Sequence, residues 1–532
     1  MRSALVSILL FLLAILTAQG GCADQLRIGI ELPSQVPVPA PVKSALQDIG
    51  INYVNYYVVS GQHDTQGNAR TVNNAMMGLC KDLGLDFSIA CHHIDPPDAC
   101  VREAALEGGE RFRGVVFDEL EHCRLMNSYA PTPLADYKSF TSLEDAFDKT
   151  QQGYRELKQK FESLNSSVTA THMWPVLTHT AAHEGFTVCA KICKETYSAV
   201  QLAMAIGAAK QYGADLWVDC DLWFWDLIPG HTPEEFRSNL LLAYWLGADL
   251  TYVEGCGYNL KPAGKQGIPF SLMTMAREDT YQLTPHGEVL RWFCKDYVPG
   301  HPRTWTFRDV KPDIAIVRYE DTCHGQRYTA DWPDRLYGCD SLTSDADTEA
   351  WLGIWNLLTF GKTGRDGLSL FKAWVRPSGY ERGVQKGVAV SYQSRPVQAD
   401  IHRFFVPLNG VVVYDHTVGY AALKDIPLIF VTGKHLSEKT ALAVKRCVQD
   451  GATCVMWGPL AKQHGYPDWE LGTRVVKDGA GKLVLAEDFG FREVYQEIKG
   501  MIGRPDEIRY RFGDYKVVLR RVTDNKISVE LD

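Results

Sequence analysis

The sequence predicts an α/β protein with an N-terminal (β/α)8 TIM barrel, a second α/β domain and a small C-terminal β segment. Short apolar runs alternate with amphipathic stretches over about the first 300 residues, which is typical of a parallel sheet. Seven or eight such units in about 280 residues fit a closed barrel better than an open sheet. A second strand–helix–strand pattern over 426–458 predicts another parallel sheet.

The expected barrel strands are the apolar runs, which lie at 26–32, 51–59, 85–94, 113–119, 168–175, 214–225 and 248–255. The eighth strand is the least distinct, and "PRTWTF" at 302–307 is the candidate for it. Helical patterns separate several runs. The one in "TPEEFRSNLLLAYWLG" should begin at Thr232, which precedes Pro233 and two acidic residues, and should end at Gly247.

These patterns divide the chain into four parts. Residues 1–23 read as a signal peptide, 24–310 as the barrel, 311–475 as the second domain, and 476–532 as a C-terminal β region with a hairpin turn at "TDN". The second domain is expected to be Rossmann-like, because strands and helices alternate in it.

The first residues predict export. Arg2 precedes an apolar stretch from Ala4 to Ala18, and small residues follow, with cleavage expected near Ala23. The alternative is lipid attachment at Cys22, although Gln19 is unusual for such a signal. The protein is therefore expected to be secreted or periplasmic, or an outer-membrane lipoprotein. The net charge of −9 argues against a nucleic-acid partner.

Disulfides can form in an exported protein, and the chain contains 14 cysteines. At least one disulfide is therefore expected. The local pairs are Cys189–Cys193, Cys323–Cys339 and Cys447–Cys454, and buried free thiols are the alternative for each. "CHHIDPPDAC" at 91–100 does not have a standard zinc spacing. No metal and no cofactor are predicted.

The catalytic residues of a barrel lie where its strands end. The polar and aromatic residues at those positions are Glu31, His92, His93, Asp118, Glu119, Glu121, Trp174, Asp219, Asp221, Trp223, Trp225 and Glu254. Two facing carboxylates are what glycoside hydrolysis requires, and aromatic rings suit the C–H faces of sugars. The chain contains no phosphate-binding loop and no G-x-S-x-G serine motif. An oligosaccharide or polysaccharide is therefore the expected substrate.

In this strand count "GVVFDELEH" follows the fourth strand and "LTYVEG" the seventh. Carboxylates at these positions resemble those of clan A of the glycoside hydrolases. The layout of barrel, α/β domain and β tail resembles family 42 β-galactosidases, and so does "TPHGEVLRWFCKDYV" before "DIAIVRY". The resemblance implies a retaining β-glycosidase with Glu119 as acid/base and Glu254 as nucleophile. It also implies a glutamine-amidotransferase-like second domain that assembles the chain into a homo-oligomer, a trimer or a dimer.

Several alternatives stay open. Asp118 stands where the clan has Asn, so Asp118 and Glu121 are the alternatives to Glu119 as the acid. Glu119 should hold a proton near neutral pH, and Glu254 should be ionised.

The other functions considered are an inverting glycosidase and a barrel that binds carbohydrate without cleaving it. An active amidotransferase is disfavoured, because Cys447 falls in an expected helix and Cys454 in an expected strand.

Overall fold

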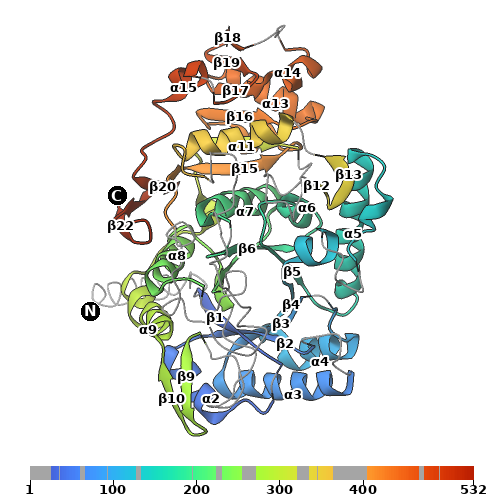
Figure 1. Cartoon of the computed structure of the whole chain (residues 1–532), viewed down its shortest axis with the longest axis vertical. Coiled ribbons are helices and arrows are strands. Elements are labelled where there is room, and N and C mark those ends of the chain that lie inside the picture. The colour runs from blue at the N-terminus through green and yellow to red at the C-terminus, as the bar shows by residue number, and fades with distance from the viewer. Residues whose placement is uncertain are drawn as a thin grey trace, which may run out of the picture.

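The structure is a computed structural model that describes residues 26–34, 36–59, 66–92, 94–126, 133–194, 196–222, 230–254, 271–319, 335–343, 346–363, 404–466, 472–490 and 492–532. Figure 1 shows the barrel in the lower part of the molecule and a second sheet above it. The predicted signal peptide, the Cys22 anchor, His93, Trp223 and Trp225 lie outside the described residues.

Eight parallel strands form a closed barrel in chain order, which confirms the predicted TIM-like fold. Strand β8 closes the barrel by pairing with β1, where Leu250 lies opposite Arg27. The strands are β1 (Arg27–Leu32), β2 (Tyr53–Tyr57), β3 (Asp86–Cys91), β4 (Phe112–Phe117), β5 (Val168–His172), β6 (Thr187–Ile192), β7 (Leu216–Asp221) and β8 (Leu250–Glu254).

Helices connect the strands and surround the barrel (Figure 1). Helix α8 begins as predicted, since the Thr232 hydroxyl accepts a hydrogen bond from the Glu235 amide. The helices in this part are α2 (Ala40–Ile49), α3 (Gln66–Leu83), α4 (Asp98–Gly108), α5 (Leu143–Glu162), α6 (Thr178–His183), α7 (Ser198–Tyr212), α8 (Pro233–Trp245), α9 (Pro285–Trp292) and α10 (Val298–Gly300). A hairpin of β9 (Met273–Arg277) and β10 (Thr280–Leu283) precedes α9.

The predicted strand count was wrong in two places. Residues 187–192 form β6, which was not predicted, and 302–307 form no strand but lead into a 3-10 turn at Phe307–Asp309. The run at 248–255 is therefore the eighth strand and not the seventh. Consequently Glu254 ends β8, and the carboxylates that end β7 are Asp219 and Asp221.

The second domain contains a six-stranded sheet in the order β15-β11-β16-β17-β19-β18. Its strands are β11 (Ile314–Arg318), β15 (Val411–Asp415), β16 (Leu428–Thr432), β17 (Thr453–Trp457), β18 (Thr473–Asp478) and β19 (Gly481–Ala486), and all are parallel except β18. Its helices are α11 (Ala346–Leu358), α12 (Tyr420–Leu423), α13 (Glu438–Gln449), α14 (Gly458–Gln463) and α15 (Arg492–Ile498). Because β18 spans the predicted boundary at 475, this sheet continues beyond it. The amidotransferase-like character stays a prediction.

The C-terminal residues form a four-stranded sheet in the order β14-β20-β21-β22. The strands are β14 (Leu408–Asn409), β20 (Glu507–Phe512), β21 (Tyr515–Arg521) and β22 (Ile527–Leu531), and the predicted turn at "TDN" joins the last two. Trp305 of the barrel stacks on Tyr515 with ring centroids 4.7 Å apart, which holds this sheet against the barrel. A short hairpin of β12 (Arg335–Leu336) and β13 (Cys339–Thr343) completes the described strands.

The expected disulfides are absent from the described residues, in which all eleven cysteines are free thiols. Cys189 and Cys193 are both buried and unbridged, and so are Cys447 and Cys454. Cys323 lies outside the described residues. These thiols pack as small apolar side chains, a common role of buried cysteine. Among the described helices, none has the length and hydropathy needed to cross a membrane.

Helix α7 of the barrel packs directly against β15 of the second domain. An ideal Cβ on Gly207 would lie 1.7 Å from the carbonyl oxygen of Val413, so only glycine permits this approach. Polar contacts surround the approach of Gly207 to Val413. His179 Nε2 donates to the Val413 carbonyl at 2.8 Å, and Gln211 Nε2 donates to Asp415 Oδ1 at 2.6 Å.

We expect Gly207→Ala to destabilise the protein by about 1–3 kcal/mol or more, because backbone on both sides of the contact prevents relaxation. Gly78→Ala in α3 is the matched control. No neighbouring atom lies within 4 Å of its ideal Cβ, and alanine there should be neutral or stabilising by up to about 1 kcal/mol. Urea denaturation of both variants measures the effect. Equal unfolding midpoints for the two variants would contradict the packing argument.

Candidate active site

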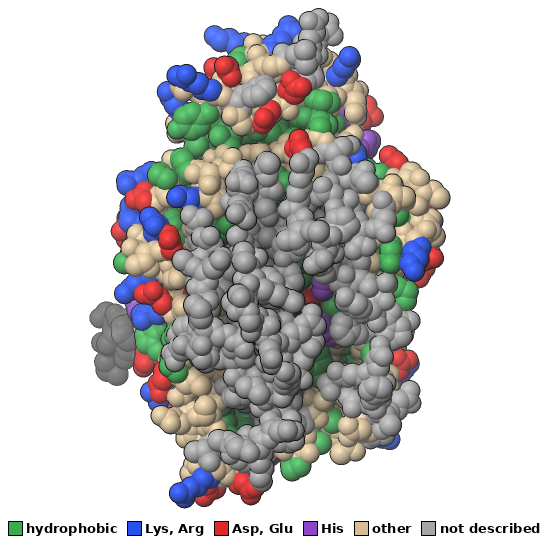
Figure 2. All heavy atoms as spheres, in the orientation of Figure 1, with side chains coloured by type: hydrophobic (Ala, Val, Ile, Leu, Met, Phe, Trp, Pro, Cys, Tyr) green, Lys and Arg blue, Asp and Glu red, His purple; other side chains and the backbone are tan. Residues whose placement is uncertain are grey.

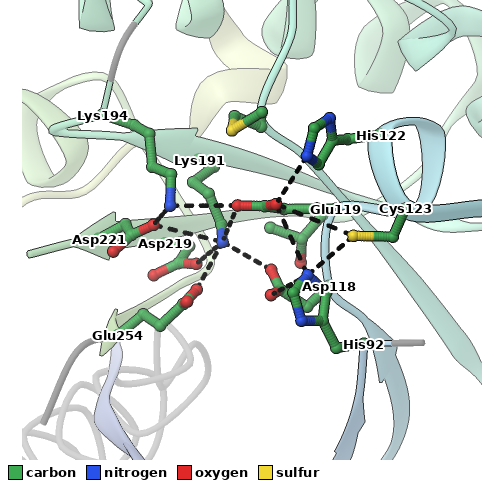
Figure 3. Close-up of polar contacts among 12 residues, drawn as sticks. His92, Asp118, Glu119, His122, Cys123, Lys191, Lys194, Asp219, Asp221 and Glu254 are labelled. Atoms are coloured by element: carbon green, nitrogen blue, oxygen red, sulfur yellow. Dashed lines mark hydrogen bonds and ion pairs between the residues drawn. The ribbon is translucent and has the colours of Figure 1, made fainter. Parts of the chain in front are cut away.

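A buried lysine lies at the centre of the candidate site. The side chain of Lys191, on β6, is fully buried, and its Nζ lies within ion-pair distance of five carboxylates (Figure 3). The distances are 2.6 Å to Glu254 Oε2, 2.7 Å to Asp118 Oδ1, 3.1 Å to Glu119 Oε1, 3.3 Å to Asp221 Oδ2 and 3.8 Å to Asp219 Oδ2. Acidic and histidine atoms are visible near the middle of the face in Figure 2.

The barrel topology explains why these residues meet. The carboxyl ends of parallel barrel strands converge at one face. Asp118 and Glu119 follow β4, Asp219 and Asp221 end β7, and Glu254 ends β8. Asp219 and Asp221 are two residues apart on one strand and therefore project to the same side. The structure thus brings together five of the predicted site residues.

Glu119 is held as a carboxylate. Its backbone lies in the left-handed region at φ 47°, a conformation uncommon for a non-glycine residue. Burial alone would raise the pKa of Glu119, but Lys191 and Lys194 outweigh burial and hold the pKa well below its usual range. Lys194 Nζ lies 3.1 Å from Glu119 Oε1, and His92 Nε2 lies 3.6 Å from Glu119 Oε2.

Glu254 has the opposite tendency. Burial raises its pKa, and the charges of Asp118 and Asp221 raise it further, so that the pKa is about 7 despite the contact with Lys191. These directions are opposite to the expected division of protons, in which Glu119 holds the proton and Glu254 is ionised. The cause is the pair of lysines, which were not predicted. Both lysines lie 3.1 Å from Glu119 Oε1, and Lys191 also lies 2.6 Å from Glu254 Oε2.

Two further carboxyl groups carry raised pKa values. Burial raises the pKa of Glu31, which lies near the end of β1, and the neighbouring Glu254 raises it further. Burial also raises the pKa of Asp219, followed by the effect of Glu254. Both groups therefore tend to hold protons that can be donated in hydrogen bonds.

Glu121, one alternative acid, has a structural role in this arrangement. It is fully buried, and its Oε1 accepts hydrogen bonds from the amides of Met173 and Trp174 at 2.8 and 2.9 Å. Burial raises its pKa to about 8. These contacts fix the chain after β5. Trp174 is itself buried, with its ring 5.8 Å from that of His122, so it does not present a face to solvent.

Histidine and cysteine side chains border Glu119 on the other side. His92 Nε2 lies 2.8 Å from Cys123 Sγ and 3.7 Å from Asp118 Oδ2. Burial lowers the pKa of His92, but Cys123 and Glu119 outweigh it and raise the pKa. Burial lowers the pKa of His122 to about 4, so this imidazole is neutral near pH 7.

The central carboxylates also form a geometric candidate for a metal. Oxygen atoms of Asp118, Asp219 and Glu254 lie within 4.8 Å of one another. Lys191 Nζ, however, already contacts all three groups and supplies the positive charge that an ion would supply. Burial lowers the pKa of Lys191, but its carboxylate neighbours outweigh burial and raise it well above its usual value. The lysine is therefore a permanent ammonium at this position.

Sequence reasoning missed four residues of the site, namely Lys191, Lys194, His122 and Cys123. The two lysines belong to β6 and the residues just after it. The available signal was the alternation in "TVCAKI", where Val188, Ala190 and Ile192 are apolar. His122 and Cys123 begin a short π-helical segment, His122–Met126, directly after Glu121.

No protein-family model matches the chain, and no curated protein sequence matches it. Several solved structures are similar to it at low sequence identity. The exo-β-1,4-mannosidase Op5Man5 from Opitutaceae bacterium strain TAV5 is 10% identical, with a TM-score of 0.48 over 90% of this chain and 94% of that one. The catalytic domain of a chitinase from Pyrococcus furiosus is 11% identical, with a TM-score of 0.29 over 53% and 97%.

An epimerase is similar to the same degree. The D-psicose 3-epimerase from Clostridium cellulolyticum H10 is 10% identical, with a TM-score of 0.28 over 52% of this chain and 98% of that one. Two of these three neighbours are glycoside hydrolases by name. At these identities and TM-scores the likeness does not indicate an activity, so the choice of function depends on the site residues. The family 42 layout stays a resemblance.

Proposed function

We propose that the protein is a retaining glycoside hydrolase in which Glu119 is the nucleophile and Glu254 the general acid/base. The observation that carries this proposal is the position of two lysines: Lys191 Nζ and Lys194 Nζ each lie 3.1 Å from Glu119 Oε1, and Lys191 Nζ also lies 2.6 Å from Glu254 Oε2. The directions of the two pKa shifts agree with it. Glu119 is held ionised, as a nucleophile must be, and Glu254 titrates near pH 7, where an acid/base works best.

The geometry agrees with a double displacement. Glu119 Oε1 and Glu254 Oε2 contact the same nitrogen, at 3.1 and 2.6 Å, so they are separated by no more than the sum of these distances. Retaining enzymes place the two carboxyl groups roughly 5–5.5 Å apart, and inverting enzymes roughly 6.5–9.5 Å. The contacts therefore favour retention.

In the proposed reaction, Glu254 protonates the glycosidic oxygen as the Glu119 carboxylate attacks the anomeric carbon. A glycosyl ester on Glu119 forms, and the alcohol leaves. Glu254, now ionised, removes a proton from water, which attacks the same carbon and releases the sugar with retained configuration. Asp118, Glu31 and Asp219 are suited to hydrogen-bond sugar hydroxyls, since all three are buried beside the pair.

Amine catalysis is the function that Lys191 itself could suggest. A lysine that forms a Schiff base must lose its proton, which usually requires a lowered pKa. The carboxylates around Lys191 raise its pKa instead. The site therefore favours an electrostatic role for this residue.

The proposal is tested by screening nitrophenyl glycosides and a panel of polysaccharides for hydrolysis, with proton NMR of the first product. At least one glycoside should be cleaved with retained configuration. An inverted product would contradict the double displacement. Binding of carbohydrate without cleavage would favour the non-catalytic barrel.

The pH profile provides a second prediction. We expect kcat/KM to fall about tenfold per pH unit above about pH 7, because Glu254 must be protonated to act as the acid. Glu119 should add no loss of activity near neutral pH, since its pKa lies well below the usual value. The descending limb should disappear in Glu254→Gln assayed on a substrate with an activated leaving group. A rate that increases through pH 7 would be inconsistent with these roles.

A further inference from the structure

A second cluster of metal-ligating side chains lies beside the candidate active site. Cys193 follows β6, while His231 and Glu235 lie at the start of α8. All three are fully buried. One ligand atom from each lies within 4.8 Å of the other two. None of them contributes to the proposed hydrolysis, so the cluster needs an explanation of its own.

The local structure fixes each member. Cys193 has a left-handed backbone at φ 64°, and its amide donates to Ser198 Oγ at 3.3 Å. His231 and Glu235 are four residues apart, a spacing that places side chains together at a helix start. His231 Nδ1 lies 3.0 Å from Glu235 Oε2.

A second histidine holds the backbone of this cluster. His286 Nε2 donates to the carbonyl oxygen of His231 at 2.8 Å, and the Thr232 hydroxyl caps the first turn of α8. The positions of His231 and Glu235 are thus set before any ligand binds, which reduces the entropy lost on binding.

We propose that Cys193, His231 and Glu235 bind a thiophilic divalent cation of the Zn²⁺ class. Thiolate, imidazole and carboxylate are the three ligand types of protein zinc sites, with bonds of about 2.0–2.3 Å. Ligand atoms around one such ion lie roughly 3–4 Å apart, so small inward shifts from the present separations suffice. The ion would also balance the carboxylate that Glu235 places in the interior.

A metal bound at this site would affect the candidate active site through the backbone that joins Cys193 to Lys194. Cys193 immediately precedes Lys194, whose Nζ contacts Glu119 and Asp221. A metal on Cys193 would therefore restrain the segment that presents Lys194. Metal binding itself does not depend on the proposed glycosidase activity, and it can be tested without a substrate.

The experiment measures metal binding to the full mature chain. Elemental analysis of protein purified without chelator gives the zinc content, and Co²⁺ titration of the chelator-treated protein gives the ligand type. One equivalent of Co²⁺ should bind and produce a thiolate-to-cobalt charge-transfer band. Cys193→Ala should lose this band and bind Co²⁺ at least about tenfold more weakly.

Cys220→Ala is the matched control. Cys220 is an equally buried thiol at the end of β7, with its sulfur 3.7 Å from the Thr251 hydroxyl, and its variant should keep the band. If Cys193→Ala does not fold, Glu235→Gln provides the same test, with the band kept and affinity about tenfold or more weaker. Absence of stoichiometric binding, a band that persists in Cys193→Ala, or unchanged affinity in Glu235→Gln would overturn the proposal.

Discussion

Glu119→Ala is expected to abolish turnover of a confirmed glycoside, and azide should restore activity with an inverted product. The loss should be on the order of 10³-fold or more, because the substitution removes the proposed attacking carboxylate. Azide fits the space left by the carboxylate and attacks from the same face in a single displacement. A β-glycoside would then give an α-glycosyl azide, which NMR identifies.

Glu254→Ala should behave differently. Loss of the acid should slow hydrolysis of unactivated glycosides by on the order of 10²–10⁴-fold, and substrates with activated leaving groups should be less affected. Azide should now intercept the glycosyl ester on Glu119 and give a product of retained configuration.

Asp221→Asn is the comparison variant for both. Asp221 shares Lys194 with Glu119 and ends β7, the strand that carries the nucleophile in the clan that the sequence resembles. It should not yield a glycosyl azide. An inverted azide product from Glu254→Ala would restore the roles expected from the sequence, and one from Asp221→Asn would move the nucleophile to β7.

Several residues of the candidate site could be predicted from the sequence. Polar residues that terminate apolar runs, such as Glu119, Asp221 and Glu254, meet because parallel strands of a barrel end at one face. This inference needs only the location of strand ends and not the order of strands. It therefore succeeded for Glu254 even though its strand was counted as the seventh.

Strand β6 could not be recognised as easily. "TVCAKI" is short, and two cysteines in and beside it suggested a disulfide instead. A lysine within an apolar strand argues against burial unless the residue is paired. The partners of Lys191 lie 28 to 73 residues away in the sequence, in or just after β4, β7 and β8, so no local sequence pattern indicates the pairing.

The expected proton assignment was made without knowledge of Lys191 and Lys194. Burial raises the pKa of both Glu119 and Glu254, so burial alone cannot separate them. Lys191 and Lys194 both lie 3.1 Å from Glu119 Oε1 and lower its pKa, whereas the charges of Asp118 and Asp221 raise the pKa of Glu254. The position of Lys194 depends on the conformation of the residues after β6. The sequence can therefore predict the carboxylate pair but not its division of roles.

Lys191→Met is expected to destabilise the protein by about 3–5 kcal/mol at neutral pH, because it leaves several buried carboxylates without their shared cation. The effect should depend on pH. In the wild type, the depressed pKa of Glu119 contributes stability above its unfolded value of about 4.5. In the variant, burial should raise the carboxyl pKa values, so stability is lost as pH rises. The difference between the two proteins should therefore grow from about pH 4.5 upward.

Lys149→Met is the matched control, since Lys149 forms an exposed pair with Asp145 at 2.9 Å. Such surface pairs contribute only about 0–1 kcal/mol to the free energy of unfolding. No deeply buried group is involved, so this contribution should change little between pH 5 and pH 7.5. Urea unfolding of the wild type and both variants at pH 5 and pH 7.5 makes the comparison. If Lys191→Met unfolds within about 1 kcal/mol of the wild type at pH 7.5, the carboxylates do not depend on this ammonium. The ionised state of Glu119, and with it the proposed nucleophile, would then need another source of positive charge.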